Sequence, residues 1–208
     1  MTNLSKTLAV GSAILALAGS AHSATVTVGP GGFDDGFATT ITYDTEARRG
    51  DANDRDNALN ALGANDGSFF ELGFGSTVDL TFGGVFNTSV DIYEVTFGSA
   101  ANFPESVNVF AGSGGLFELV GTLTNSDASG GATVSLSGLI GATFDTLRLI
   151  DTSPLTSTAQ SDAFGPLGGF DLDAARVSIA PVPLPAAGML LLTAIGGLTA
   201  MRRRKARS

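Results

Sequence analysis

Short runs rich in Val, Thr, Phe and Ile recur along this chain, and glycines and other turn residues separate them. These residue types suit the half-buried surface of a pleated sheet, and glycine is common in the turns between strands. The spacing predicts an all-β fold, an antiparallel β-sandwich. We expect strands at 24–28, 37–44, 69–73, 77–82, 90–97, 106–111, 117–123, 133–137, 143–150 and 171–179, and helical character only at 54–62.

The strand expected at 90–97 breaks the alternation of apolar and polar residues that a half-buried strand shows. Val90 and Ile92 share one face with Glu94. The Glu94 side chain must therefore lie on an inward face, or a bulge must accommodate it. A buried carboxylate needs a cation or several hydrogen-bond donors, so Glu94 is a candidate site residue.

Two other segments are rich in side-chain oxygens. Asp171 and Asp173 share one face of the last expected strand, about 7 Å apart, where carboxylates repel unless a cation or water lies near them. The loop 51–66 contains many Asp and Asn residues, the side chains that bind Ca²⁺. The alternatives are a solvated loop and a capping carboxylate beside a solvent-facing one. The candidate ligands of a structural Ca²⁺ are Asn60, Asp66, Glu94, Asp171 and Asp173.

Composition excludes several kinds of chemistry. The chain has no Cys and one His, His22, in a segment that we expect to be removed. Disulfides, thiolate sites and a Ser-His-Asp triad are thereby excluded from the body. From Asp34 to Asp173 there are 20 acidic and five basic residues, a net charge of −15, which disfavours nucleic acid as a partner. Among the basic residues, Arg48 and Arg49 are expected to be solvated. We expect no enzymatic activity, and a hydrolase that uses only carboxylates is the alternative.

The first 23 residues have the layout of a secretory signal peptide. Lys6 provides a positive n-region, and residues 8–18 form an apolar h-region that is about half as long as a membrane-spanning helix. Small residues at positions −3 and −1 predict cleavage between Ser23 and Ala24. An N-terminal membrane anchor is the alternative.

The C-terminal segment combines a proline-containing motif, an apolar stretch and a basic end. Residues 182–201 number 20, enough for a helix that just crosses about 30 Å of hydrocarbon. A basic cluster after such a helix stays in the cytoplasm, so we expect the body on the outer side of the membrane. The motif consists of Val182, Pro183, Leu184, Pro185 and Ala186, and the basic cluster of Arg202, Arg203, Arg204 and Lys205.

This tail resembles the VPLPA-CTERM sorting signal, a variant of the PEP-CTERM class that exosortases process. The resemblance implies that an exosortase-type membrane peptidase cuts near residues 182–186. The body would then be transferred to another anchor or released toward extracellular polysaccharide. An ordinary C-terminal membrane anchor is the alternative.

Short motifs in the body are similar to a region common in exported proteins of the PEP-CTERM class. They lie at 55–57, 61–67, 70–75, 91–95 and 169–174. Asn65 stands where those proteins usually have proline, and Glu71 where they usually have serine. The layout is similar to discoidin-like, galactose-binding-like jelly rolls, several of which hold a structural Ca²⁺ and bind glycans.

These features predict three parts: a signal peptide helix at 1–23, an exported β-sandwich domain at 24–180 and a sorting tail with a transmembrane helix at 181–208. We expect a structural or adhesive protein of the cell surface or extracellular matrix, associated with polysaccharide and stabilised by Ca²⁺. The alternatives are a lectin-like carbohydrate-binding module and a carboxylate-dependent glycan hydrolase or lyase. An exposed aromatic shelf would favour the lectin, and two carboxylates in one pocket, one with a raised pKa, would favour the enzyme.

Overall fold

The computed structural model describes residues 22–28, 36–47, 49–50, 54–96, 99–137, 139, 143–154 and 169–179. Most of the expected signal peptide lies outside the described residues, and so do the sorting motif at 182–186 and the basic cluster at 202–205. In the described ranges, no helix is both long and apolar enough to span a membrane.

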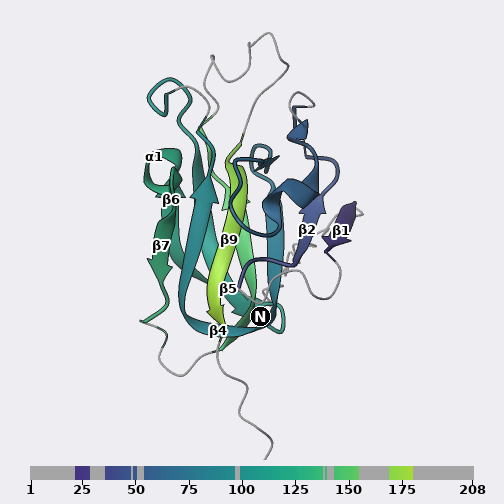
Figure 1. Cartoon of the computed structure of the whole chain (residues 1–208), viewed down its shortest axis with the longest axis vertical. Coiled ribbons are helices and arrows are strands. Elements are labelled where there is room, and N and C mark those ends of the chain that lie inside the picture. The colour runs from purple at the N-terminus through teal and green to yellow at the C-terminus, as the bar shows by residue number, and fades with distance from the viewer. Residues whose placement is uncertain are drawn as a thin grey trace, which may run out of the picture.

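The described part of the chain consists almost entirely of antiparallel strands (Figure 1). The helical elements are short: the 3-10 helix η2 (Ala58–Ala61) and the α-helix α1 (Asn125–Ala128). The strands are β1 (Ser23–Thr27), β2 (Thr40–Asp44), β3 (Phe70–Glu71), β4 (Thr77–Glu94), β5 (Ser106–Ser113), β6 (Leu116–Thr124), β7 (Ala132–Ser135), β8 (Phe144–Asp151) and β9 (Asp171–Ile179).

Strand β4 takes part in both layers of the fold. Its first half lies between β2 and β8 in the order β1-β2-β4-β8-β5-β6. Its second half pairs with β7 and β9, and β9 also pairs with β3. The register shifts after Thr81 against β8 and after Phe86 against β9. Gly83, with φ +70°, lies at this change, so β4 bends from one sheet into the other (Figure 1).

The sequence predicts two strands, at 77–82 and 90–97, where the structure has β4 alone. The glycines at positions 83 and 84 suggest a turn, but glycine inside a strand can equally mark a bend of a continuous strand. The prediction of a break here is wrong, although the two halves do pair with different partners.

The hydrophobic core lies between the two layers. One cluster of buried apolar side chains includes Val78 from the first half of β4 and Val90 from the second half. The rings of Phe82 and Phe86 meet edge to face at 5.4 Å between centroids, and Phe144 lies 6.0 Å from Phe86. Because both layers contribute to one core, the antiparallel β-sandwich predicted from the sequence is confirmed.

Candidate functional site

Glu94 is buried at the end of β4, with 4% of its surface exposed. The register between β4 and β9 shifts between Tyr93 and Glu94. The inward orientation and the bulge expected from the sequence therefore both occur. Atom Oε2 accepts a hydrogen bond from the Thr96 hydroxyl at 2.7 Å. Atom Oε1 is shielded from solvent and has no hydrogen-bond partner among the described residues. Burial raises the pKa of Glu94 to about 7.

Glu105, directly before β5, lies against Glu94. The two carboxyl groups are within hydrogen-bonding contact of each other, and Glu105 Oε2 is also shielded and accepts no hydrogen bond from a donor in the described part of the chain. Burial and then the charges of Asp171 and Glu94 raise the pKa of Glu105 to about 10, against a hydrogen bond from the Asp171 backbone amide. Two acidic side chains thus lie in direct contact, one of them buried and the other half-buried.

Two more carboxylates lie at the same end of the sandwich. Asp171 begins β9 and Asp151 ends β8; their exposed fractions are 4% and 2%. Burial is the main reason that the pKa of Asp171 lies well above its ordinary value, and the charges of Glu71 and Glu94 add to the effect. We refer to Glu94, Glu105, Asp151 and Asp171 as the carboxylate cluster.

The inward-facing rows of four strands explain why the carboxylate cluster forms. Glu105 is two residues before the buried Val107, and Asp151 is two residues after the buried Leu149, so each lies in line with an inward-facing row; Asp151 is buried and Glu105 half-buried. Val107 and Asp151 are register partners in one layer. In the other layer, Glu94 pairs with the residue that follows Asp171. Strand ends from both layers therefore bring the four carboxylates together.

The members of the carboxylate cluster differ in their hydrogen bonds. Asp151 accepts from the backbone amides of Gly75, Ser153 and Phe170 and from the Ser153 hydroxyl, at 2.8 to 3.1 Å. Burial still raises its pKa. Asp151 is therefore a buried structural carboxylate with four protein donors, whereas one oxygen each of Glu94 and Glu105 accepts from no donor among the described residues.

A buried ion pair lies next to the carboxylate cluster. Arg55 Nη1 is 3.6 Å from Glu71 Oε2, and both side chains are at most 5% exposed. The positive charge of Arg55 lowers the pKa of Asp171. The Arg55 guanidinium therefore acts on two carboxylates, those of Glu71 and Asp171.

The remaining candidate ligands perform other roles. Asp173 accepts hydrogen bonds from the backbone amides of Asp66 and Gly67 at 3.1 and 3.2 Å, which ties the loop to β9. Asp66 Oδ1 accepts from the Ser68 amide, and Asn60 donates to two backbone carbonyls. Asp173 is thus the capping carboxylate, and Asp171 is buried rather than solvent-facing.

The predicted ligand set is therefore divided between two places. The structure brings Glu94 and Asp171 together, and separately Asp66 and Asp173. Over the described ranges, no three His, Cys, Asp or Glu side chains are already arranged to hold a metal ion. Ca²⁺ binding remains a prediction, and Glu105 and Asp151 are the residues that sequence reasoning missed.

The expectation that Arg49 is solvated is wrong, and Arg48 lies outside the described residues. Arg49 donates hydrogen bonds to the backbone carbonyls of Asp44, Glu71 and Leu72 at 2.7 to 2.9 Å. Its guanidinium lies 4.7 Å from the centroid of the Phe70 ring. The planar group with several donors thus joins the end of β2 to the carbonyls of β3 and of the residue after it.

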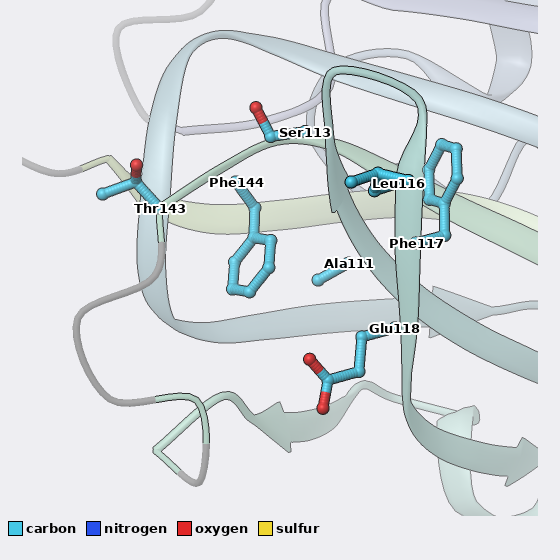
Figure 2. A pocket seen from close by; sticks show the side chains of 7 residues that line it. All are labelled: Ala111, Ser113, Leu116, Phe117, Glu118, Thr143 and Phe144. Carbon is cyan, nitrogen blue, oxygen red and sulfur yellow. The ribbon is translucent and has the colours of Figure 1, made fainter.

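A shallow pocket of about 270 Å³ lies on the β5–β6 hairpin (Figure 2). Leu116 is 82% exposed beside it, and the guanidinium of Arg148 lies 3.8 Å from the Phe117 ring centroid. The pocket combines an apolar wall with one carboxylate and two hydroxyls, and no member of the carboxylate cluster lines it. The lining residues are Ala111, Ser113, Leu116, Phe117, Glu118, Thr143 and Phe144.

No protein-family model and no curated protein matches the sequence. Similar solved structures include the family 32 carbohydrate-binding module of Clostridium perfringens NanJ in complex with galactose (16% identity, TM-score 0.42, covering 66% of this chain and 92% of that one). Another is the C-terminal domain of a Bacteroides fragilis chitobiase (12% identity, TM-score 0.41, covering 62% of this chain and 89% of that one). A third is a Ruminococcus gnavus GH29 fucosidase in complex with fucose, with 13% identity and a TM-score of 0.42. The match covers 69% of this chain but only 25% of the fucosidase chain.

Proposed function

We propose that this chain is an exported structural or adhesive protein of the cell surface or extracellular matrix, sorted by its C-terminal tail. The observation that carries the proposal is the order of VPLPA at 182–186, an apolar stretch and the basic cluster at 202–205. A plain anchor needs only the apolar stretch and the flanking charge. The proline-containing motif before them is the feature that a processing peptidase would read.

The position of the expected signal cleavage is compatible with the fold. Strand β1 pairs with β2 from Ser23↔Asp44 to Thr27↔Thr40. A cut between Ser23 and Ala24 removes only the first of these pairs. The remaining strand still forms the edge of the sheet, which supports a mature domain that begins at Ala24.

The distribution of carboxylates supports a binding or structural role rather than hydrolysis. A glycosidase of the ordinary kind needs an acid and a second carboxylate on either side of one substrate site. The raised pKa values of Glu94 and Glu105 come from burial between the layers, and neither residue lines the hairpin pocket. In this proposal their role is structural.

The test is to replace Pro183 and Pro185 with Ala in the full chain and to follow its size and location in the producing cell. We expect the double variant to keep its tail and to accumulate in the membrane at higher mass. Pro181→Ala is a matched control just outside the motif and should be processed normally. Normal size and location for the double variant would remove the sorting proposal and leave an ordinary anchor.

A lectin-like module is the second candidate, and the hairpin pocket is the observation that favours it. Glu118, Ser113 and Thr143 offer oxygen atoms beside the Phe144 ring, a combination that suits sugar hydroxyls and a sugar's apolar face. Affinity electrophoresis in gels that contain extracellular polysaccharide tests this role. Retardation that is lost in Glu118→Gln, but kept when the distant Glu46 is changed to Gln, would support it; migration unaffected by polysaccharide would reject it.

A further inference from the structure

Strand β6 forms an edge of the described sheet. It ends the order β1-β2-β4-β8-β5-β6 and, among the described strands, pairs with β5 alone. The backbone groups on its outer side thus have no partner strand in the described part of the chain, and such an edge can pair with a strand of another chain. With nine residues, β6 is longer than β1, the five-residue strand at the opposite end of this order.

Natural edge strands carry features that prevent pairing with other chains, and β6 has few of them. Lys, Pro and bulges are common examples. The sequence of β6, LFELVGTLT, contains neither Lys nor Pro, and Glu118 is its single charged residue. A register shift against β5 leaves Val120 without an opposite residue, so one bulge is present. The regular edge is therefore the first half of β6, from Leu116 to Leu119.

Apolar side chains occupy both faces of this first half. Leu116 is 82% and Leu119 53% exposed, and they are two of the four large apolar side chains exposed in the described ranges. Figure 2 shows Leu116 and Phe117 on opposite sides of the strand, and the Arg148 guanidinium lies over the Phe117 ring. A strand that is apolar on both faces suits a position inside a sheet better than one at its edge.

The charge of the body restricts where two copies of this chain can meet. Residues 34–173 carry a net charge of −15, so two copies repel each other across most of their surface. The first half of β6 combines one charge with exposed leucines. It is therefore a surface at which the repulsion is small and the gain from burying apolar area is large.

The hairpin surface is also complementary to itself. A two-fold interface needs a protruding group and a matching recess in the same patch. Leu116 protrudes beside the hairpin pocket of about 270 Å³, which is larger than the cavity of about 150 Å³ that holds a benzene molecule. The leucine of one copy can thus enter the pocket of the other.

We propose that two copies of this chain associate through the first half of β6, as an antiparallel pair of edge strands centred on Phe117. Leu116 then lies opposite the partner's Glu118, at the mouth of the hairpin pocket. A centre at Glu118 would place two carboxylates directly opposite each other, which is unfavourable. The pair does not depend on how the tail is processed, and a sugar in the pocket would compete with it.

Cross-linking of single cysteines tests the contact, because the full chain has no cysteine of its own. The purified full chain in mild detergent is treated with a short bismaleimide and analysed on a denaturing gel. In the proposed pair, the two Cα atoms of residue 118 lie about 8 Å apart, so Glu118→Cys should give covalent dimer as the major product. Thr25→Cys in β1 and Ser135→Cys in β7 are exposed controls and should remain monomeric.

A second substitution in the Glu118→Cys chain identifies the side chain that holds the pair. Leu116→Asp adds a negative charge at the contact and should lower the yield of dimer by about tenfold or more. Leu59→Asp changes another exposed leucine, in η2, and should leave the yield unchanged. Melting curves check that both variants fold, which we expect because both leucines are exposed.

Three results would overturn the proposal. Absence of dimer from Glu118→Cys would mean that β6 does not meet a second copy. Equal yields from Glu118→Cys, Thr25→Cys and Ser135→Cys would place the association elsewhere, such as in the tail. An undiminished yield in the Leu116→Asp chain would exclude the edge as the contact.

Discussion

Glu94 and Glu105 meet in the sandwich with their carboxyl groups in hydrogen-bonding contact, and each has one shielded carboxyl oxygen that accepts no hydrogen bond from a donor among the described residues. They belong to opposite layers, and the polypeptide between them leaves one sheet and enters the other. A proton shared by the two carboxyl groups removes their repulsion, and loss of that proton restores it. The free energy of unfolding of the domain should therefore depend on pH through this contact.

In the absence of divalent cations, stability should fall as the pH increases from 5 to 7.5. Glu94 has a pKa of about 7 in the folded chain against 4.5 as its ordinary value. The folded state therefore holds the proton over a range where the unfolded state has lost it, and this contribution disappears as the pH passes the folded pKa. Glu105 and Asp171 face Glu94 and act in the same direction.

Urea denaturation in EDTA at pH 5 and 7.5 measures this dependence. We expect a loss of about 1–3 kcal/mol for wild type and a smaller loss for Glu94→Gln. Stability that stays constant or increases over this range would contradict the buried state of Glu94.

Asp151→Asn should destabilise the domain although it removes a negative charge. The carboxylate accepts four hydrogen bonds, three of them from the backbone amides of Gly75, Ser153 and Phe170. An amide group would turn an NH₂ toward at least one of these donors and leave it unsatisfied. We expect a loss of about 2–4 kcal/mol in urea denaturation, and less than about 0.5 kcal/mol for the exposed Asp145→Asn. Equal losses of stability in Asp151→Asn and Asp145→Asn would show that the hydrogen bonds to Asp151 do not stabilise the fold.

Arg148→Lys should weaken the pairing of β4 with β8. Arg148 binds Asp79 with two hydrogen bonds, Nε–Oδ1 at 2.7 Å and Nη2–Oδ2 at 2.8 Å, and its guanidinium stacks over Phe117. Lysine cannot make both contacts. Because the pair is about a third exposed, we expect a loss of about 1 kcal/mol. A double-mutant cycle with Asp79→Asn measures the coupling, and a coupling of zero would contradict this interaction.

Gly36→Ala should strongly destabilise the domain. Its φ is +82°, and a Cβ would lie 2.1 Å from the Val177 carbonyl oxygen. The Val177 amide also donates to the Gly36 carbonyl at 2.8 Å, so the two backbones cannot separate without losing this bond. We expect a loss of about 3 kcal/mol or more.

Gly114→Ala is the matched control for Gly36→Ala. It also has a positive φ, +61°, but open space around the added Cβ. It should cost about 1 kcal/mol, the strain of the backbone alone. Equal melting temperatures for the two variants would show that Val177 does not restrict Gly36.

The local pattern of residues predicts most of the strands. The last strand is predicted with the bounds of β9 (Asp171–Ile179), and the short helical segment at 54–62 contains η2. The helix α1 was not predicted, although Thr124 and Asp127 form a capping box that indicates a helix start. The continuous path of β4 could not be predicted, because glycine at 83 and 84 is equally compatible with a turn and with a bend.

The candidate site could be predicted only in part. Glu94 is recognisable because it interrupts a buried row inside one strand. Glu105 and Asp151 extend the buried rows of β5 and β8, so continuing the alternation of Val107 and Leu149 by two positions would have found them. That these strand ends meet depends on the bend of β4 and on the pairing of β9, which sequence spacing does not determine.

The central claim is that the chain is exported and cut at both ends. Mass spectrometry of the terminal peptides, on protein isolated from the surface or medium of the producing cell, tests it most directly. We predict an N-terminus at Ala24 and a C-terminus within residues 182–186. A full-length polypeptide in the cytosol, with both Met1 and Ser208 present, would contradict it.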